Sequence, residues 1–141
     1  MNFYHAGFTG TRNGITFHQA QKIRVMLTAL DKVMFFHHGD CVGADASAHH
    51  IAIQCGKSII IHPPVDDKYR AFMGGGEVRY AKEYIARNHD IVDECMVLIA
   101  CPGERIEKMR SGTWATIRYA RKMKKQIIII FPDGETKIEN A

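Results

Sequence analysis

Residues Gln126–Phe131 read QIIIIF, so five successive side chains of this stretch are apolar. A strand with one face in solvent alternates apolar and polar residues, whereas a parallel strand covered on both faces is apolar throughout. The stretch therefore indicates a strand of a sheet that helices cover on both sides. Two further stretches have the same character and predict further strands of that sheet: VMFF at 33–36 and SIII at 58–61.

Working outward from this stretch, predicted strands alternate with predicted helices. The strands are expected at Asn2–Gly7, Lys32–His37, Ser58–His62, Met96–Cys101 and Gln126–Phe131. Four helices are indicated by apolar or small residues at helical spacing: Ala20, Ile23, Leu27 and Leu30; Ala44, Ala48, Ile51, Ala52 and Cys55; Val78, Ala81, Ile85, Asn88 and Val92; Thr113, Thr116, Ile117, Ala120 and Met123.

Local signals support these helices. Thr16 and Gln19 form a capping box before the first helix, and Gly56 follows the second helix as a C-terminal cap. The alternation predicts an α/β fold, a doubly wound Rossmann-like parallel sheet of five strands in the order 3-2-1-4-5 with helices on both faces. Residues 1–141 are expected to form a single domain.

Composition narrows the class of protein. The chain has 141 residues, of which 46% are hydrophobic and 24% charged, and its formal net charge is +4. These proportions exclude a disordered or low-complexity chain. The longest apolar runs fall far short of the ~20 residues that cross a membrane, and no secretory signal is visible. The four cysteines form no CxxC pair, which favours free thiols in a cytoplasmic protein.

Residue types typical of phosphate sites follow three of the predicted strands. In parallel sheets, ligands bind beyond the carboxyl ends of the strands, where the strand order reverses. Glycine lets a backbone approach a phosphate, and a helix N-terminus offers free N–H groups to an anion. We therefore predict an anion or nucleotide site at this edge, made of Gly7, Phe8, Thr9, Gly10, Thr11 and Arg12; Gly39, Asp40, Gly43, Ala44 and Asp45; and Arg110, Ser111, Gly112 and Thr113. The alternative is that the glycines only form tight turns and that Thr113 only caps its helix.

The dipeptide Arg87-Asn88 adds two candidates to this site. Asn88 falls on the apolar stripe of its helix, where an unpaired amide is costly, so we expect it to bond a neighbouring loop backbone or the ligand. Arg87 either reaches the ligand edge or forms a surface salt bridge. Asp40 and Asp45 are candidate acceptors for ribose hydroxyls, although Asp45 could instead cap its helix. Trp114 is expected to be buried, with stacking on a base or a subunit interface as alternatives.

The eight histidines do not predict a metal site, because no HExxH or Cys/His ligand spacing is present. The pairs that come closest to ligand spacing are Asp45 with His49 and His38 with Asp40. His37 and His62 end predicted strands, so they could line the pocket. They are more simply explained as core histidines bonded to backbone carbonyls.

Three other features have structural explanations that we favour. Cys41 lies where a nucleophile could act, but no His–Asp partner can be assigned, which favours an inert thiol. The basic residues between Arg118 and Lys125 suit a solvated helix end, so nucleic-acid binding is not expected. The stretch Pro63–Gly76 is the one long irregular connection, and such loops are often lids or binding loops.

Four stretches together resemble the SLOG superfamily, the Rossmann-like group that includes the LOG phosphoribohydrolases and the DprA/SMF proteins. They are GFTGTR (7–12), HHGDCVGADASAH (37–49), ARNHDIV (86–92) and RSGTWATIRYARK (110–122). Within the superfamily, the chain most resembles the small stand-alone YspA/YpsA-related proteins. The resemblance implies that a nucleotide or NAD-derived ligand binds across Gly7–Arg12 and Ser111–Thr113.

The chain departs from the catalytic members of that group. LOG enzymes carry a PGGxGTxxE motif, but here Thr116 stands in the place of the glutamate, and Arg87 matches the family's catalytic arginine only loosely. We therefore expect no catalytic residues, no resident cofactor and a protein that senses, carries or sequesters a nucleotide or an NAD/ADP-ribose derivative, for example in phage–host signalling. A homodimer or higher oligomer is expected. The alternatives are an N-glycosidase of LOG type, using Asp45, Glu94 or Glu104, and a single-stranded DNA-binding module of DprA type.

Overall fold

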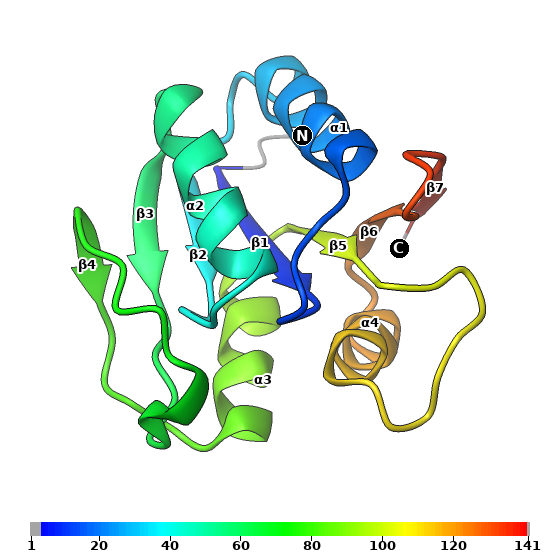
Figure 1. Cartoon of the computed structure of the whole chain (residues 1–141). Coiled ribbons are helices and arrows are strands. Elements are labelled where there is room, and N and C mark those ends of the chain that lie inside the picture. The colour runs from blue at the N-terminus through cyan, green and yellow to red at the C-terminus, as the bar shows by residue number, and fades with distance from the viewer. Residues whose placement is uncertain (1–3, 141) are drawn as a thin grey trace.

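A computed structural model describes residues 4–140. They contain a seven-stranded sheet in the order β4-β3-β2-β1-β5-β6-β7 (Figure 1). Neighbouring strands are parallel except β6 and β7, which are antiparallel. The strands are β1 His5–Gly10, β2 Phe35–His38, β3 Ser58–Ile61, β4 Gly76–Val78, β5 Val97–Cys101, β6 Gln126–Ile130 and β7 Thr136–Glu139.

The sheet has seven strands, so the prediction of five was wrong in number. The five apolar strands occur in the predicted order, and the additional strands β4 and β7 extend the two edges. Both are short, and all three residues of β4 are exposed. Short polar edge strands of this kind carry no continuous apolar run, so periodicity does not reveal them.

The predicted first strand was also misplaced. Strand β1 runs from His5 to Gly10 rather than from Asn2 to Gly7, and Asn2 and Phe3 lie outside the described residues. Gly7, Phe8, Thr9 and Gly10 pair with β5 as part of the strand, and the connection to the next helix starts only at Thr11. The start of β2 shifts by as much, from Lys32 to Phe35, and the other predicted strand ends shift by one residue at most.

Four α-helices cover the sheet, α1 Phe17–Ala29, α2 Ala44–Gln54, α3 Tyr84–Glu94 and α4 Gly112–Lys122. A single 3-10 turn, η1 at Asp67–Tyr69, lies between β3 and β4. Helices α1 and α2 cover one face of the sheet, and α3 and α4 cover the other (Figure 1). None of the helices in the described part of the chain is long and apolar enough to cross a membrane.

The capping box before α1 is confirmed. The Thr16 hydroxyl accepts a hydrogen bond from the Gln19 backbone N–H, and the Gln19 side chain accepts one from Thr16 N–H, both at 3.0 Å. Gln19 is buried and also donates to the carbonyls of Pro102 and Ile130. One residue thus starts α1 and ties it to the carboxyl ends of β5 and β6.

The predicted third helix began too early. Val78 belongs to β4, Ala81 lies in the connection after it, and Ile85 is 73% exposed. The true helix starts at Tyr84 and buries Arg87, Ile91 and Val92 instead. At α4 the cap is Ser111, whose hydroxyl accepts from Trp114 N–H, and not Thr113.

Candidate functional site

The loops after β1 and β5 lie side by side at the carboxyl edge of the sheet. Gly10 at the end of β1 pairs with Cys101 at the end of β5. A Cβ atom added to Gly103 would lie 3.7 Å from the Thr11 side chain, so the two loops stay in contact beyond the strands. The second of these loops leads through a wide arc into α4 (Figure 1). The prediction that the strand order reverses between these loops is therefore confirmed.

The first turn of α4 is open at this edge. The Ser111 hydroxyl takes the N–H of Trp114, whereas the N–H groups of Gly112 and Thr113 have no partner within residues 4–140. A Cβ added to Gly112 would meet no atom within 4 Å. Two free donors at the positive end of an 11-residue helix are suited to holding an anion.

The glycines nearer the sheet have a packing role instead. A Cβ added to Gly10 would lie 2.5 Å from the Cβ of Ala44, the first residue of α2, and one on Gly7 would lie 2.9 Å from Ile91 in α3. Gly43 has a φ of +88° and lies directly against the Arg12 carbonyl. Gly7 and Gly10 let α3 and α2 approach the sheet closely, and Gly43 lets the loop after β1 approach the start of α2. Because Gly7 and Gly10 lie within β1, the alternative of tight turns was wrong for these two residues.

Phe8 and Ala44 are part of the hydrophobic core. Both are fully buried, in the cluster between the sheet and helices α1 and α2. Thr9, one residue along β1 from Phe8, is only partly buried. Because side chains alternate along a strand, Thr9 points to the same face as Gly7, the face that α3 covers.

Arg87 lies inside the protein, so the predicted surface salt bridge was wrong, although its side chain does reach the loop after β2. Its side chain is 5% exposed and donates hydrogen bonds to the carbonyls of Gly39 (2.5 Å) and His62 (3.1 Å). Its Nε donates to the Asn88 side chain at 2.6 Å, so Asn88 bonds this arginine rather than a loop backbone. Arg87 thereby joins α3 to the ends of β2 and β3, and leaves Gly39 no space for a side chain.

Asp40 holds the long connection after β3 in place. It is fully buried, and its carboxylate accepts from Arg70 Nε at 2.8 Å and from Met73 N–H at 2.9 Å. Its carbonyl accepts from Ala71 N–H at 2.7 Å. With both carboxylate oxygens used inside the protein, Asp40 does not face a ribose as predicted, and the stretch 63–76 is tied to the loop after β2.

Asp45 supports the same loop from within α2. The helix cap is Gly43, so the predicted capping role of Asp45 is wrong, but its carboxylate accepts from Cys41 N–H at 3.1 Å. Burial raises the pKa of Asp45 to about 6, although the charge of Arg87 acts in the opposite direction. Burial and then the Asp45 charge raise the pKa of the Cys41 thiol, which favours the neutral, unreactive form.

Two tyrosines at this edge were not predicted, and one of them contacts the predicted residue Arg12. The Arg12 guanidinium is exposed and lies 4.0 Å from the centre of the Tyr69 ring. The Tyr84 hydroxyl oxygen is shielded from solvent and has no hydrogen-bond partner within residues 4–140. Burial raises the pKa of Tyr84, so this hydroxyl keeps its proton and can donate it to a bound group. Nothing in the sequence marked either tyrosine, because each depends on loop geometry.

Several polar side chains of α4 form contacts within the protein. Trp114 is 3% exposed and donates to Glu104 at 2.7 Å, so its predicted burial is confirmed and a role in a subunit contact is not supported. The Thr116 hydroxyl is buried against the Gly112 carbonyl. Arg118 and Arg121 pair with acidic side chains, so part of the basic run is already neutralised.

A hollow of about 950 Å³ lies elsewhere on the surface. It is bounded by α1 from Phe17 to Val25 and by the turn Asp133–Glu135, and none of the predicted site residues lines it. It has no concentration of buried polar donors comparable with the carboxyl edge. We therefore place the candidate site at that edge.

The sequence matches no protein-family model and no curated protein. Solved structures with the same fold include DNA processing protein A from Streptococcus pneumoniae (22% identity, TM-score 0.67, 90% of this chain and 50% of that one). They also include the molybdenum cofactor binding protein from Rippkaea orientalis (18% identity, TM-score 0.70, 93% and 78%). A third is DNA processing protein A from Helicobacter pylori, described with its mode of binding single-stranded DNA (18% identity, TM-score 0.66, 91% and 65%).

These likenesses establish the fold. The chain is an α/β protein with a mostly parallel sheet, and it spans half the length of the Streptococcus protein.

Proposed function

We propose that this chain is a SLOG-type binding protein that holds a phosphorylated small molecule, a nucleotide or a nucleotide derivative, at the carboxyl edge of its sheet. The observation that carries the proposal is the open first turn of α4. There the N–H groups of Gly112 and Thr113 have no partner within residues 4–140, and the space around Gly112 is open. A phosphate at this position would accept both hydrogen bonds and gain from the helix dipole.

The surroundings favour a larger anionic ligand than phosphate alone. Arg12 and Arg110 are both exposed, and each belongs to a loop that ends at this edge. The Tyr69 ring next to Arg12 offers a flat apolar surface, and the Tyr84 hydroxyl offers a donor. A ligand with phosphate at one end and a heterocycle or sugar at the other would contact the arginines, the tyrosine ring and the tyrosine hydroxyl. Asp40, Asp45 and Arg87 then shape the loops and do not contact the ligand.

We propose binding without turnover because of the residues at α4 and the contacts of the nearby carboxylates. Thr116 supplies no carboxylate, and its hydroxyl is bonded within the helix. Of the three carboxylates considered for glycosidic cleavage, Glu104 accepts from Trp114 and Glu94 pairs with Arg79. The third, Asp45, is buried in the loop after β2. Carriage, sequestration or sensing is therefore the proposed role. Membership of the YspA/YpsA-related group, phage signalling and oligomer formation stay predictions from the resemblance.

A thermal-shift titration with AMP, NAD, ADP-ribose and inorganic phosphate tests the proposal. A ligand at 100 times its Kd stabilises the folded state by about 2.7 kcal/mol, which raises the melting temperature by about 8 °C for a chain of this size. Gly112→Asp should abolish the shift, because its carboxylate occupies the anion position, and the acid suits the helix N-terminus, so folding is kept.

Gly74→Asp is the matched control. Gly74 also has open space around it and no positive φ, but it lies just before β4, away from α4. The control should retain the full shift. The proposal fails if none of the four compounds raises the melting temperature, or if Gly112→Asp responds like the unmodified protein.

The same samples separate the two alternatives. Release of free base from AMP or NAD, followed by chromatography, would identify an N-glycosidase in place of a binding protein. A single-stranded oligonucleotide bound with an affinity that falls steeply with salt would identify a DNA-binding module. The ion pairs of Arg118 and Arg121 reduce the free positive charge on α4, so we expect no such binding.

A further inference from the structure

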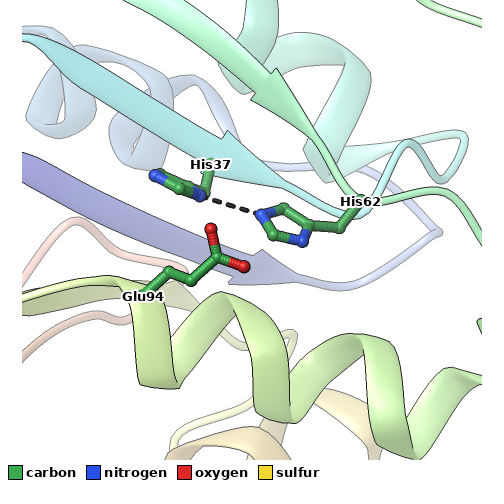
Figure 2. A group of neighbouring side chains, drawn as sticks. All are labelled: His37, His62 and Glu94. Carbon is green, nitrogen blue, oxygen red and sulfur yellow. Dashed lines mark hydrogen bonds between the residues drawn. The ribbon is translucent and has the colours of Figure 1, made fainter. Parts of the chain in front are cut away.

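Two histidines and a glutamate meet on the face of the sheet that α3 covers. His37 is in β2, His62 directly follows β3, and Glu94 ends α3. One ligand atom from each of the three lies within 4.8 Å of the others. Figure 2 shows the Glu94 carboxylate directed toward the pair of imidazole rings. The cluster has no part in the proposed anion site.

The two imidazoles point ring nitrogens toward each other. His37 Nδ1 and His62 Nε2 are 2.8 Å apart, and both side chains are buried. A neutral imidazole nitrogen with a free lone pair is the commonest protein ligand of zinc-class ions.

The distance between the two histidine nitrogens is slightly shorter than in a tetrahedral site. With metal–ligand bonds of 2.0–2.1 Å, two nitrogens on a tetrahedral zinc are about 3.3 Å apart. The two histidines would therefore need to separate by about 0.5 Å relative to their 2.8 Å contact. A side-chain rotation of this size requires no backbone movement, and the carboxylate is already on the same side.

Outer partners of two of the ligands are also present. His37 Nε2 lies 2.8 Å from His5 Nδ1, so His37 can donate its second ring N–H to His5 while Nδ1 binds a metal. Arg79 donates to one Glu94 oxygen at 2.7 Å, which fixes the carboxylate and leaves the other oxygen for a cation. Arg79 also pairs with Glu77, so its positive charge is shared between two carboxylates. Such outer hydrogen bonds orient the ligands of natural zinc sites.

We propose that His37, His62 and Glu94 bind one zinc-class divalent cation through two imidazole nitrogens and one carboxylate oxygen. Three protein ligands leave a fourth position for water or an exogenous group. The cation would join α3 to β2 and β3, which are already paired with each other in the sheet. No metal-binding motif marks these residues, because the ligands come from three separate elements and form no short spacing pattern.

Cobalt titration of the purified, chelator-treated protein tests the proposal, with zinc competition as a second measurement. Tetrahedral Co²⁺ bound to nitrogen and oxygen gives visible d–d absorption, and zinc should displace it at one equivalent per chain. Glu94→Gln keeps the size and the partial exposure of the side chain, so it should fold. It should weaken Co²⁺ binding at least about tenfold, the lower end of the effect seen when even an outer partner is lost.

Matched controls come from the same elements. Glu83→Gln makes the same change at the exposed start of α3, and His50→Gln removes an exposed histidine from α2. Both should bind Co²⁺ as the unmodified protein does, and His62→Gln should behave like Glu94→Gln if it folds. The proposal is overturned if the unmodified protein gives no d–d absorption, which would leave the two histidines as a simple hydrogen-bonded pair. Equal loss in Glu83→Gln and Glu94→Gln would also overturn it.

Discussion

Replacing Asp45 by asparagine should stabilise the protein at high pH. Burial raises the pKa of this carboxyl from 3.8 to about 6, so the folded state disfavours the ionised form by about 3 kcal/mol, at 1.36 kcal/mol for each pH unit. Between these two pKa values the folded protein holds a proton that the unfolded chain releases. The stability that the protonated group contributes is therefore fully present below about pH 4 and is lost as the pH rises through 6.

Asparagine has a similar shape and can still accept from Cys41 N–H, but it does not ionise. The unfolding free energy of Asp45→Asn, minus that of the unmodified protein, should rise between pH 4 and pH 8 by up to about 3 kcal/mol. The histidines titrate in both proteins, so their contribution to the unfolding free energy cancels in this difference. Urea unfolding followed by the fluorescence of the single, buried tryptophan measures it.

Asp31→Asn, at an exposed position after α1, is the control and should show no such rise. The reasoning is refuted if Asp45→Asn is the less stable protein at pH 8 and the difference falls with pH. The ionised carboxylate would then gain more from Arg87 than burial costs it.

Three further changes test the packing around the site. Gly10→Ala should destabilise the fold by about 1–3 kcal/mol, because its Cβ would lie 2.5 Å from that of Ala44, and urea unfolding measures the loss. Ser111→Ala removes the cap on Trp114 N–H and should cost about 1 kcal/mol in the same assay, while the fold is kept. Arg87→Lys keeps one nitrogen in place of three, so it loses the hydrogen bond to Asn88 and the contact with Cys41; it should cost about 2 kcal/mol or more, with faster hydrogen exchange in the loop after β2, and unchanged exchange would argue against the connecting role of Arg87.

Continuous apolar runs made the middle of the sheet predictable. Gln126–Phe131 and SIII at 58–61 form buried strands because only helix-covered strands tolerate such runs. The alternation of strands and helices then predicted the order of the five apolar strands, which the structure confirms. The edge strands β4 and β7 are short and mostly polar, and their pairing depends on neighbours that are distant in sequence. No local sequence pattern therefore predicts these two strands.

Some of the local structure around the candidate site was predictable, but the contacts of most of its residues were not. Ser111 and Gly112 could be assigned to a helix start because capping is a local effect. The roles of Asp40 and Arg87 could not, because each is set by partners some 30 to 48 residues away in the chain. A glycine at position 10 could likewise be required for contact with a ligand or for contact with a helix. Only the position of Ala44 in the structure shows that the helix contact requires it.

The most direct test of the anion site is an amide NMR titration of the ¹⁵N-labelled 16.0 kDa protein with ADP-ribose and AMP. We expect the largest shift changes at the N–H groups of Gly112 and Thr113, with smaller ones at Thr11 and Arg12. Changes confined to Phe17 and Gly134, which line the hollow beside α1, would contradict this account of where the protein binds its ligand. The absence of any change with either compound would contradict the proposal that it binds nucleotides.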